Sequence, residues 1–199
     1  LFRSGQWSRT VGQAQFGQEI FGQTLGIIGL GNIGAAIARR GFHGFNMNIL
    51  YHGRQEKLEL AQPLNARFCE LDELLEQSDF IVVAVDLNAN TQHLIDAEAF
   101  KKMQSHAVFV NISRGAVVDE QALIQALEQK QIFAAGLDVY EKEPLQDSAL
   151  FQLHNVVTLP HVGSATSVTR KKMAELAYQN LVKALEGGQP QYVVNPEFR

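Results

Sequence analysis

The stretch TLGIIGLGNIG, residues 24–34, decides the fold, because an apolar run leads directly into three glycines spaced as G-x-G-x-x-G. Gly29 permits a tight turn, Gly31 lets a ligand approach the backbone, and Gly34 allows close packing of the next helix. A helix that begins near Asn32 offers free amides and a positive dipole end to a phosphate. Since a strand precedes the glycines and a helix follows them, we interpret the stretch as a dinucleotide site rather than a plain packing turn.

Apolar, strand-like runs alternate with amphipathic stretches along the rest of the chain. After the first strand, we expect strands at 48–51, 66–68, 80–85, 107–112, 134–139 and 156–160. The expected helices begin near Asn32, cover 70–77 and 119–129, and end with a long final helix. This alternation is typical of a parallel, doubly wound sheet, and the lack of polar alternation in the strands fits helices on both faces. The predicted fold is therefore α/β of the Rossmann type.

Composition limits the classes of partner. The 199 residues are 46% hydrophobic and 19% charged, which is enough to bury a substantial core. A net charge of -4 with no basic stripe argues against nucleic acid. The longest apolar run, 80–85, is too short to span a bilayer, and the N-terminus lacks the pattern of a signal peptide. The single cysteine, Cys69, excludes an internal disulfide and a thiolate metal cluster. We expect a cytoplasmic protein with no nucleic-acid, membrane or metal partner.

The end of the second expected strand bears on the choice of nucleotide. An NAD enzyme usually places an acid there to bind the ribose hydroxyls. Here the strand is followed by His52-Gly53-Arg54, and the next carboxylate is Glu56. The guanidinium of Arg54 could pair with a 2′-phosphate, and His52 could add a second donor. The alternative is that both are solvated loop residues, but the pattern favours NADP (NADPH) over NAD.

Three more motifs follow expected strands, where open α/β sheets gather their ligands. They are NISRGAVVDEQAL (111–123), GLDVYEKEP (136–144) and LPHVGSAT (159–166). Together with GLGNIG, they resemble the D-isomer-specific 2-hydroxyacid dehydrogenase family, from about Trp7 to Pro196. The stretches YHGRQ (51–55), SDFIVVA (78–84) and PHVGSAT (160–166) look most like the branch of glyoxylate/hydroxypyruvate and 2-ketogluconate reductases. The resemblance implies reduction of a small 2-keto acid to the D-2-hydroxy acid.

The resemblance also implies three catalytic residues. Arg114 would hold the substrate carboxylate in a bidentate pair, which fixes the keto carbon against the nicotinamide. His161 would give a proton to the keto oxygen as hydride arrives. Glu143 would be the partner that keeps His161 protonated and oriented. Arg114 could instead be an ordinary surface arginine. Glu141 is an alternative to Glu143 as the partner of His161, and only the family's placement of the acid directly before proline favours Glu143.

His161 has five rivals among the histidines. Apart from His52, these lie in expected helix ends or loops with no accompanying motif, namely His43, His93, His106 and His154. The cofactor contacts expected from the glycine turn and from the resemblance form a larger set. They are Gly29, Gly31, Asn32, Ile33, Gly34, His52, Arg54, Val85, Ile112, Ser113, Arg114, Asp138, His161 and Gly163. Asp138 would bind the nicotinamide carboxamide, unless it is only a capping carboxylate.

Family members have an N-terminal substrate domain, and we expect that this domain is absent from the sequence. The expected organisation is a connector and dimer arm at 1–23, a dinucleotide-binding domain at 24–187, and a return toward the substrate domain at 188–199. Trp7, Phe16 and Phe21 in the arm suggest a homodimer. Two alternatives stay open: a non-catalytic nucleotide-binding module, and an NAD-linked enzyme such as a phosphoglycerate or D-lactate dehydrogenase.

Overall fold

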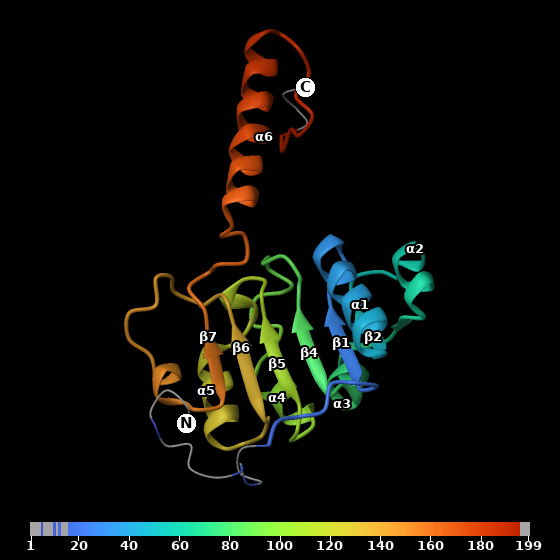
Figure 1. The fold of residues 1–199 in the computed structure, drawn as a ribbon, viewed down its shortest axis with the longest axis vertical. Coiled ribbons are helices and arrows are strands. Elements are labelled where there is room, and N and C mark those ends of the chain that lie inside the picture. The colour runs from blue at the N-terminus through green and yellow to red at the C-terminus, as the bar shows by residue number, and fades with distance from the viewer. Residues whose placement is uncertain (1–4, 6–9, 11, 13–15, 196–199) are drawn as a thin grey trace. The chain divides into compact units, whose positions relative to one another are not determined.

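The computed structural model describes residues 5, 10, 12 and 16–195. It contains two compact units, Leu1–Pro160 and His161–Arg199. In the first unit, seven strands form a sheet with the order β3-β2-β1-β4-β5-β6-β7, and every neighbouring pair is parallel (Figure 1). The strands are β1 Thr24–Ile28, β2 Asn48–His52, β3 Arg67–Phe68, β4 Phe80–Val83, β5 Val108–Asn111, β6 Ala134–Leu137 and β7 Val156–Thr158. The predicted doubly wound α/β fold is confirmed.

The helices of the first unit include the three that were expected and several shorter ones. They are α1 Asn32–Phe45, α2 Leu58–Ala61, α3 Leu71–Gln77, α4 Ala97–Lys102 and α5 Glu120–Glu128, with 3₁₀ turns η2 Gln62–Leu64, η3 Gly115–Val117 and η4 Ala149–Gln152. Asp96 and Asp119 cap α4 and α5 by accepting hydrogen bonds from the third helical amide. Helices α2 and α4 were not predicted, because segments of four and six residues are too short to show a helical period.

Two apolar cores lie on opposite faces of the sheet. One contains Leu74 and Leu75 of α3, Phe100 of α4 and Leu123 of α5. The other contains Ala35 and Ala38 of α1 together with residues of the α2–η2 segment. Successive residues of one strand divide between these cores: Ile27 packs in the second and Ile28 in the first. Burial on both faces explains why the strands lack polar alternation.

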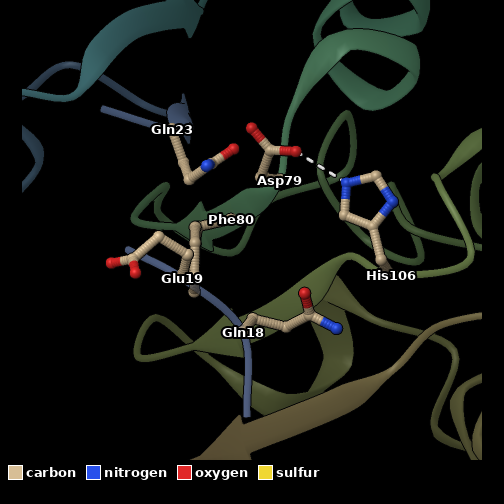
Figure 2. A pocket seen from close by; sticks show the side chains of 6 residues that line it. All are labelled: Gln18, Glu19, Gln23, Asp79, Phe80 and His106. Carbon is tan, nitrogen blue, oxygen red and sulfur yellow. Dashed lines mark hydrogen bonds and ion pairs between the residues drawn. The ribbon is translucent and has the colours of Figure 1, made fainter. Parts of the chain in front are cut away.

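The amino-terminal edge of the sheet is held by Asp79, which directly precedes β4. One carboxylate oxygen accepts a hydrogen bond from the Thr24 amide at 2.8 Å, and the other lies 2.6 Å from Nε2 of His106. Figure 2 shows this pair beside Gln18, Glu19 and Gln23, around a cavity of about 60 Å³. The pair lies at the edge opposite to the one where the strands end.

The second unit contains α6, Ser167–Leu185. Thr166 caps this helix, because its hydroxyl accepts a hydrogen bond from the Thr169 amide at 3.1 Å. None of the described side chains of α6 is buried. The predicted long final helix is therefore present.

Candidate functional site

Parallel strand pairing places five of the motif segments in one row. In register, Ile28 lies beside His52 and Val83, Val83 beside Asn111, and Asn111 beside Leu137. The residues that follow these positions therefore leave the sheet together at its carboxyl edge. They are Gly29, Gly53, Ala84, Ile112 and Asp138. In open α/β sheets this edge binds ligands, above all where the strand order reverses, which here is between β1 and β4.

The glycine turn fits its sequence at each of the three positions. Gly29 has φ +102°, and a Cβ there would lie 2.6 Å from the Ala84 carbonyl oxygen. A Cβ at Gly34 would collide with the Gly29 carbonyl oxygen, so close helix packing requires glycine. A Cβ at Gly31 would meet nothing within 4 Å. Gly31 is also the N-cap of the 14-residue helix α1 and has no side chain to cover the first amides. Open space over these amides fits a pyrophosphate group.

A cleft of about 710 Å³ opens at the switch point. Its walls are the glycine turn, the segment after β2 and the segment after β4. The lining residues are Ile28, Gly29, Leu30, Gly31, Tyr51, His52, Gly53, Arg54, Gln55, Lys57, Ala84, Val85, Asp86, Asn88, Asn90, Thr91 and Leu94. A volume of this size suits an organic ligand such as a nucleotide.

The segment after β2 brings basic side chains to one end of the cleft. His52 is half-buried, and its Nδ1 lies 3.0 Å from the Cys69 carbonyl oxygen. Its ring stacks on Phe68 at 6.3 Å between centroids and 11° between planes. Arg54 is exposed, and Lys57, which lines the same cleft, is fixed at its amide by the Tyr51 hydroxyl at 3.0 Å. The sequence interpretation had not included Lys57, although its position five residues after His52 was visible.

The segment after β5 is shaped by Asn111, a fully buried residue that sequence reasoning did not select. Its Oδ1 accepts hydrogen bonds from the Ser113 amide at 3.0 Å and the Ser113 hydroxyl at 2.9 Å, and its Nδ2 donates to the Arg114 carbonyl at 3.1 Å. These three bonds fix the turn that presents Arg114. The guanidinium is exposed and donates to the Ser113 carbonyl at 2.7 Å. Asn111 is a polar residue at the end of an apolar strand, and that signal could have identified it.

The segment after β6 carries Asp138 and Glu143. Asp138 is buried, and its amide donates to the Asn111 carbonyl at 3.1 Å. Glu143 is exposed, and its Oε1 accepts a hydrogen bond from the Tyr140 amide at 3.1 Å. The Tyr140 hydroxyl in turn donates to the Leu159 carbonyl at 2.9 Å, which ties this segment to the end of β7. Burial raises the pKa of Tyr140, so the hydroxyl stays protonated and remains a donor.

The two segments with Arg114 and Glu143 lie against each other. A Cβ at Gly115 would overlap the backbone of Tyr140 and Glu141, so the turn after Arg114 is in direct contact with the turn before Glu143. His161 and Gly163 belong to the second unit. His161 has φ 52°, a left-handed conformation that is uncommon for residues other than glycine and often marks a functional site.

The residues that the structure describes contain no group of three or more histidine, cysteine or acidic side chains able to hold a metal ion. Among the same residues, no helix has both the length and the apolar character needed to cross a bilayer. Cys69 is buried and burial raises the pKa of its thiol, which keeps it in the unreactive protonated form.

A glycine turn that feeds a helix, at the switch point of a parallel sheet, defines the class as a Rossmann-type domain. Comparison with known families gives the family within that class. Residues 1–163 match the model of the D-isomer specific 2-hydroxyacid dehydrogenase, NAD binding domain. The chain belongs to this family, as the motifs predicted, and its cofactor is a nicotinamide nucleotide.

Individual relatives agree with this assignment. Over 196 residues the chain is 50% identical to glyoxylate/hydroxypyruvate reductase B of Cronobacter sakazakii and 48% identical to that of Escherichia fergusonii. These matches cover 98% of the chain but 60% of each relative, so the chain spans about 60% of their length. The predicted resemblance to the glyoxylate/hydroxypyruvate reductases is confirmed.

Solved structures of the same family superpose closely. A glyoxylate reductase from Paecilomyes thermophila is 40% identical with a TM-score of 0.88, over 100% of this chain and 58% of that one. A D-lactate dehydrogenase from Lactobacillus jensenii, with NAD+, is 28% identical with a TM-score of 0.86, over 98% of this chain and 61% of that one. One fold thus serves enzymes with different substrates.

Proposed function

We propose that this chain is the cofactor-binding part of a reductase that converts a small 2-keto acid into the D-2-hydroxy acid with NADPH. The carrying observation is that five motif segments of the first unit leave the sheet at the same edge, where three of them line the cleft at the switch point. The candidate substrates are glyoxylate, hydroxypyruvate and 2-ketogluconate. The first two are in the names of the curated relatives.

Different residues of the chain would contact different parts of NADPH. The α1 amides beside Gly31 would hold the pyrophosphate, and the exposed Arg54 guanidinium would pair with the 2′-phosphate. Asp138 would accept from the carboxamide. The cluster of basic groups at the adenosine end supports NADPH over NADH, because no carboxylate stands where a ribose hydroxyl would need one.

Substrate handling would fall to Arg114 and His161. The Asn111 bonds hold the backbone of the turn in one conformation, so the segment from which the Arg114 guanidinium would pair with a planar carboxylate is already ordered. When bound, the cofactor supplies a hydride to the keto carbon, and negative charge then develops on the keto oxygen. His161 would donate a proton to that oxygen, and Glu143 would favour the protonated imidazole.

Steady-state kinetics on the natural gene product test the proposal. The three keto acids are assayed with NADPH and with NADH at equal concentrations. We expect reduction of at least one keto acid, with a higher kcat/KM for NADPH. Binding of nucleotide without turnover of any keto acid would instead support a non-catalytic module. Turnover that prefers NADH would support an NAD-linked dehydrogenase and overturn the nucleotide assignment.

A further inference from the structure

Three loops of the first unit meet at the carboxylate of Glu141. Its Oε1 lies 2.9 Å from Nε2 of His93, in the loop between β4 and α4. The same oxygen accepts a hydrogen bond from the Glu120 amide at 3.2 Å, at the first residue of α5. Glu120 reciprocates, because its Oε2 accepts from the Glu141 amide at 3.2 Å. One side chain therefore joins the loops that follow β4, β5 and β6.

His93 is itself held on the segment that follows Arg114. Its amide donates to the Ala116 carbonyl at 2.8 Å, and the Ile95 amide donates to the Val117 carbonyl at 3.2 Å. Its φ of 48° is in the left-handed region, which persists in a non-glycine residue when surrounding contacts impose it. The imidazole thus reaches Glu141 from a backbone that is fixed in place.

This cluster brings two carboxylates together with an imidazole and the amino-terminal end of a helix. The carboxylates of Glu120 and Glu141 each accept a hydrogen bond from the backbone amide of the other residue. Two negative charges on neighbouring side chains repel each other. Burial raises the pKa of Glu120, the Glu141 amide opposes that rise, and the Glu141 charge adds to it. The His93 imidazole lies against the Glu141 carboxylate, and the amino-terminal end of α5 favours that carboxylate.

The cluster adjoins the two turns that carry the proposed substrate residues. Glu141 stands two residues before Glu143, and Gly115 immediately follows Arg114. Gly115 packs on the backbone of Tyr140 and Glu141, so a shift of the Glu141 backbone would alter the contact between the two turns. Displacement of such a turn by an ångström can cost about a hundredfold in rate when orientation drives the reaction.

We propose that His93, Glu120 and Glu141 form a clamp that holds the Glu143 segment against the Arg114 segment, and that His93 is a positioning residue for keto-acid reduction. This inference rests on the proposed function for its kinetic consequence. Its structural part, the immobilisation of residues 139–143, does not.

The chain supplies a matched control for His93. His106 also pairs with one carboxylate, that of Asp79 (Figure 2), and the two atoms lie 2.6 Å apart. The His106 side chain is 43% exposed, against 44% for His93. His106 lies at the amino-terminal edge of the sheet. The variants His93→Ala and His106→Ala therefore remove equivalent pairs from opposite edges. His93→Gln restores a donor near the position of Nε2.

In the natural gene product, we expect His93→Ala to lower kcat/KM for the keto acid by about tenfold to a hundredfold, while the Kd for NADPH stays within about twofold. His93→Gln recovers most of the loss, and His106→Ala changes kcat/KM little. The double variant His93→Ala/Glu141→Ala loses no more than the larger single loss, because both act through one contact. Amide hydrogen exchange of 139–143 rises in His93→Ala and not in His106→Ala.

The outcomes separate the clamp from the proposed function. Wild-type protein that reduces no keto acid contradicts the proposed function, and the exchange measurement then still decides on the clamp. Unchanged exchange in His93→Ala overturns the clamp whatever the activity. Equal kinetic losses in His93→Ala and His106→Ala, with no recovery in His93→Gln, show a general loss of stability and also overturn it.

Discussion

Arg54 carries most of the proposed choice of nucleotide. It is exposed and lines the cleft two residues after the end of β2, the strand after which an NAD-binding Rossmann domain usually carries an acid. His52 is already engaged through Nδ1 with the Cys69 carbonyl and by stacking on Phe68. An exposed guanidinium beside a fixed imidazole suits a phosphate that arrives from solvent.

We expect Arg54→Ala to weaken NADPH binding by about 1.5–3 kcal/mol, the range of a hydrogen bond to a charged group, and to leave NADH binding nearly unchanged. Titration calorimetry with both nucleotides measures this difference. Arg40→Ala is the control, because Arg40 is an exposed arginine of α1 that does not line the cleft. Equal losses for the two nucleotides would refute the assignment of Arg54 to the 2′-phosphate.

The roles proposed for Arg114 and His161 predict different kinetic signatures. His161→Ala should lower kcat by about a hundredfold or more, as expected for a lost proton donor, with a smaller change in KM. Arg114→Ala should mainly raise KM for the keto acid, because it removes the anchor for the carboxylate. Both are measured by steady-state kinetics at saturating NADPH. Turnover near wild type in His161→Ala would exclude it as the acid.

At the scale of residues, the sequence predicted the functional residues that belong to motifs. It did not predict those whose role depends only on their contacts in the folded chain. The glycine turn was readable because each glycine serves a separate steric need. Asn111 and Glu120 were missed, because their roles depend on which backbone atoms lie beside them. No pattern in the sequence indicates that the Glu120 amide donates a hydrogen bond to the Glu141 carboxylate.

At the scale of elements, the parallel register explains why distant motifs share an edge. Ile28, Val83, Asn111 and Leu137 are neighbours across four strands, and a functional segment follows each of them. The strand order could be expected from the βαβ alternation, together with the site's location. The contact between the turns after Arg114 and before Glu143 could not, since it depends on loop conformations that have no period.

The junction of α5 with the loop after β6 should make stability depend on pH through Glu120. Its pKa is raised above its ordinary value of 4.5, chiefly by burial, so the folded protein binds this proton more tightly than the unfolded chain does. The stabilisation is complete below pH 4.5 and is lost as the pH rises through the folded pKa. Glu120→Gln carries no charge and keeps an oxygen acceptor for the Glu141 amide.

Thermal unfolding from acid to neutral pH tests this expectation. The midpoint of Glu120→Gln relative to wild type should increase as the pH rises above 4.5. Glu98→Gln provides a control in a surface pair with Lys101, because the Glu98 side chain is 71% exposed. A constant difference between Glu120→Gln and wild type across the range would contradict the raised pKa.

At the scale of the whole molecule, the predicted fold class and family are both confirmed, whereas the predicted domain bounds of 1–23, 24–187 and 188–199 stay predictions. Composition and periodicity identify this fold because the central strands of the sheet are largely buried and the longer helices of the first unit are amphipathic. Oligomeric state is harder to read, because an apolar side chain in an arm can pack on its own domain or on a second copy. The arm shows this directly. Of its four aromatic residues, Phe2 and Trp7 lie outside the described residues.

Phe16 and Phe21 remain largely exposed in the single chain, at 60% and 63%. Large exposed aromatics in a short segment favour an interface, and the family resemblance favours a twofold dimer. We therefore expect the natural gene product to sediment as a dimer at about tens of micromolar, because interfaces of ordinary size have Kd values from roughly micromolar down to picomolar.

The double variant Phe16→Ser/Phe21→Ser should shift that equilibrium toward monomer, because it removes two apolar groups from the interface and leaves the folded first unit intact. Leu58→Ser is the matched control, since Leu58 is equally exposed at 63% but lies on α2, away from the arm. Sedimentation velocity across a concentration series distinguishes the three proteins. A wild-type monomer at these concentrations would show that the arm does not form a dimer interface. If the control dissociates as readily as the double variant, the interface lies elsewhere.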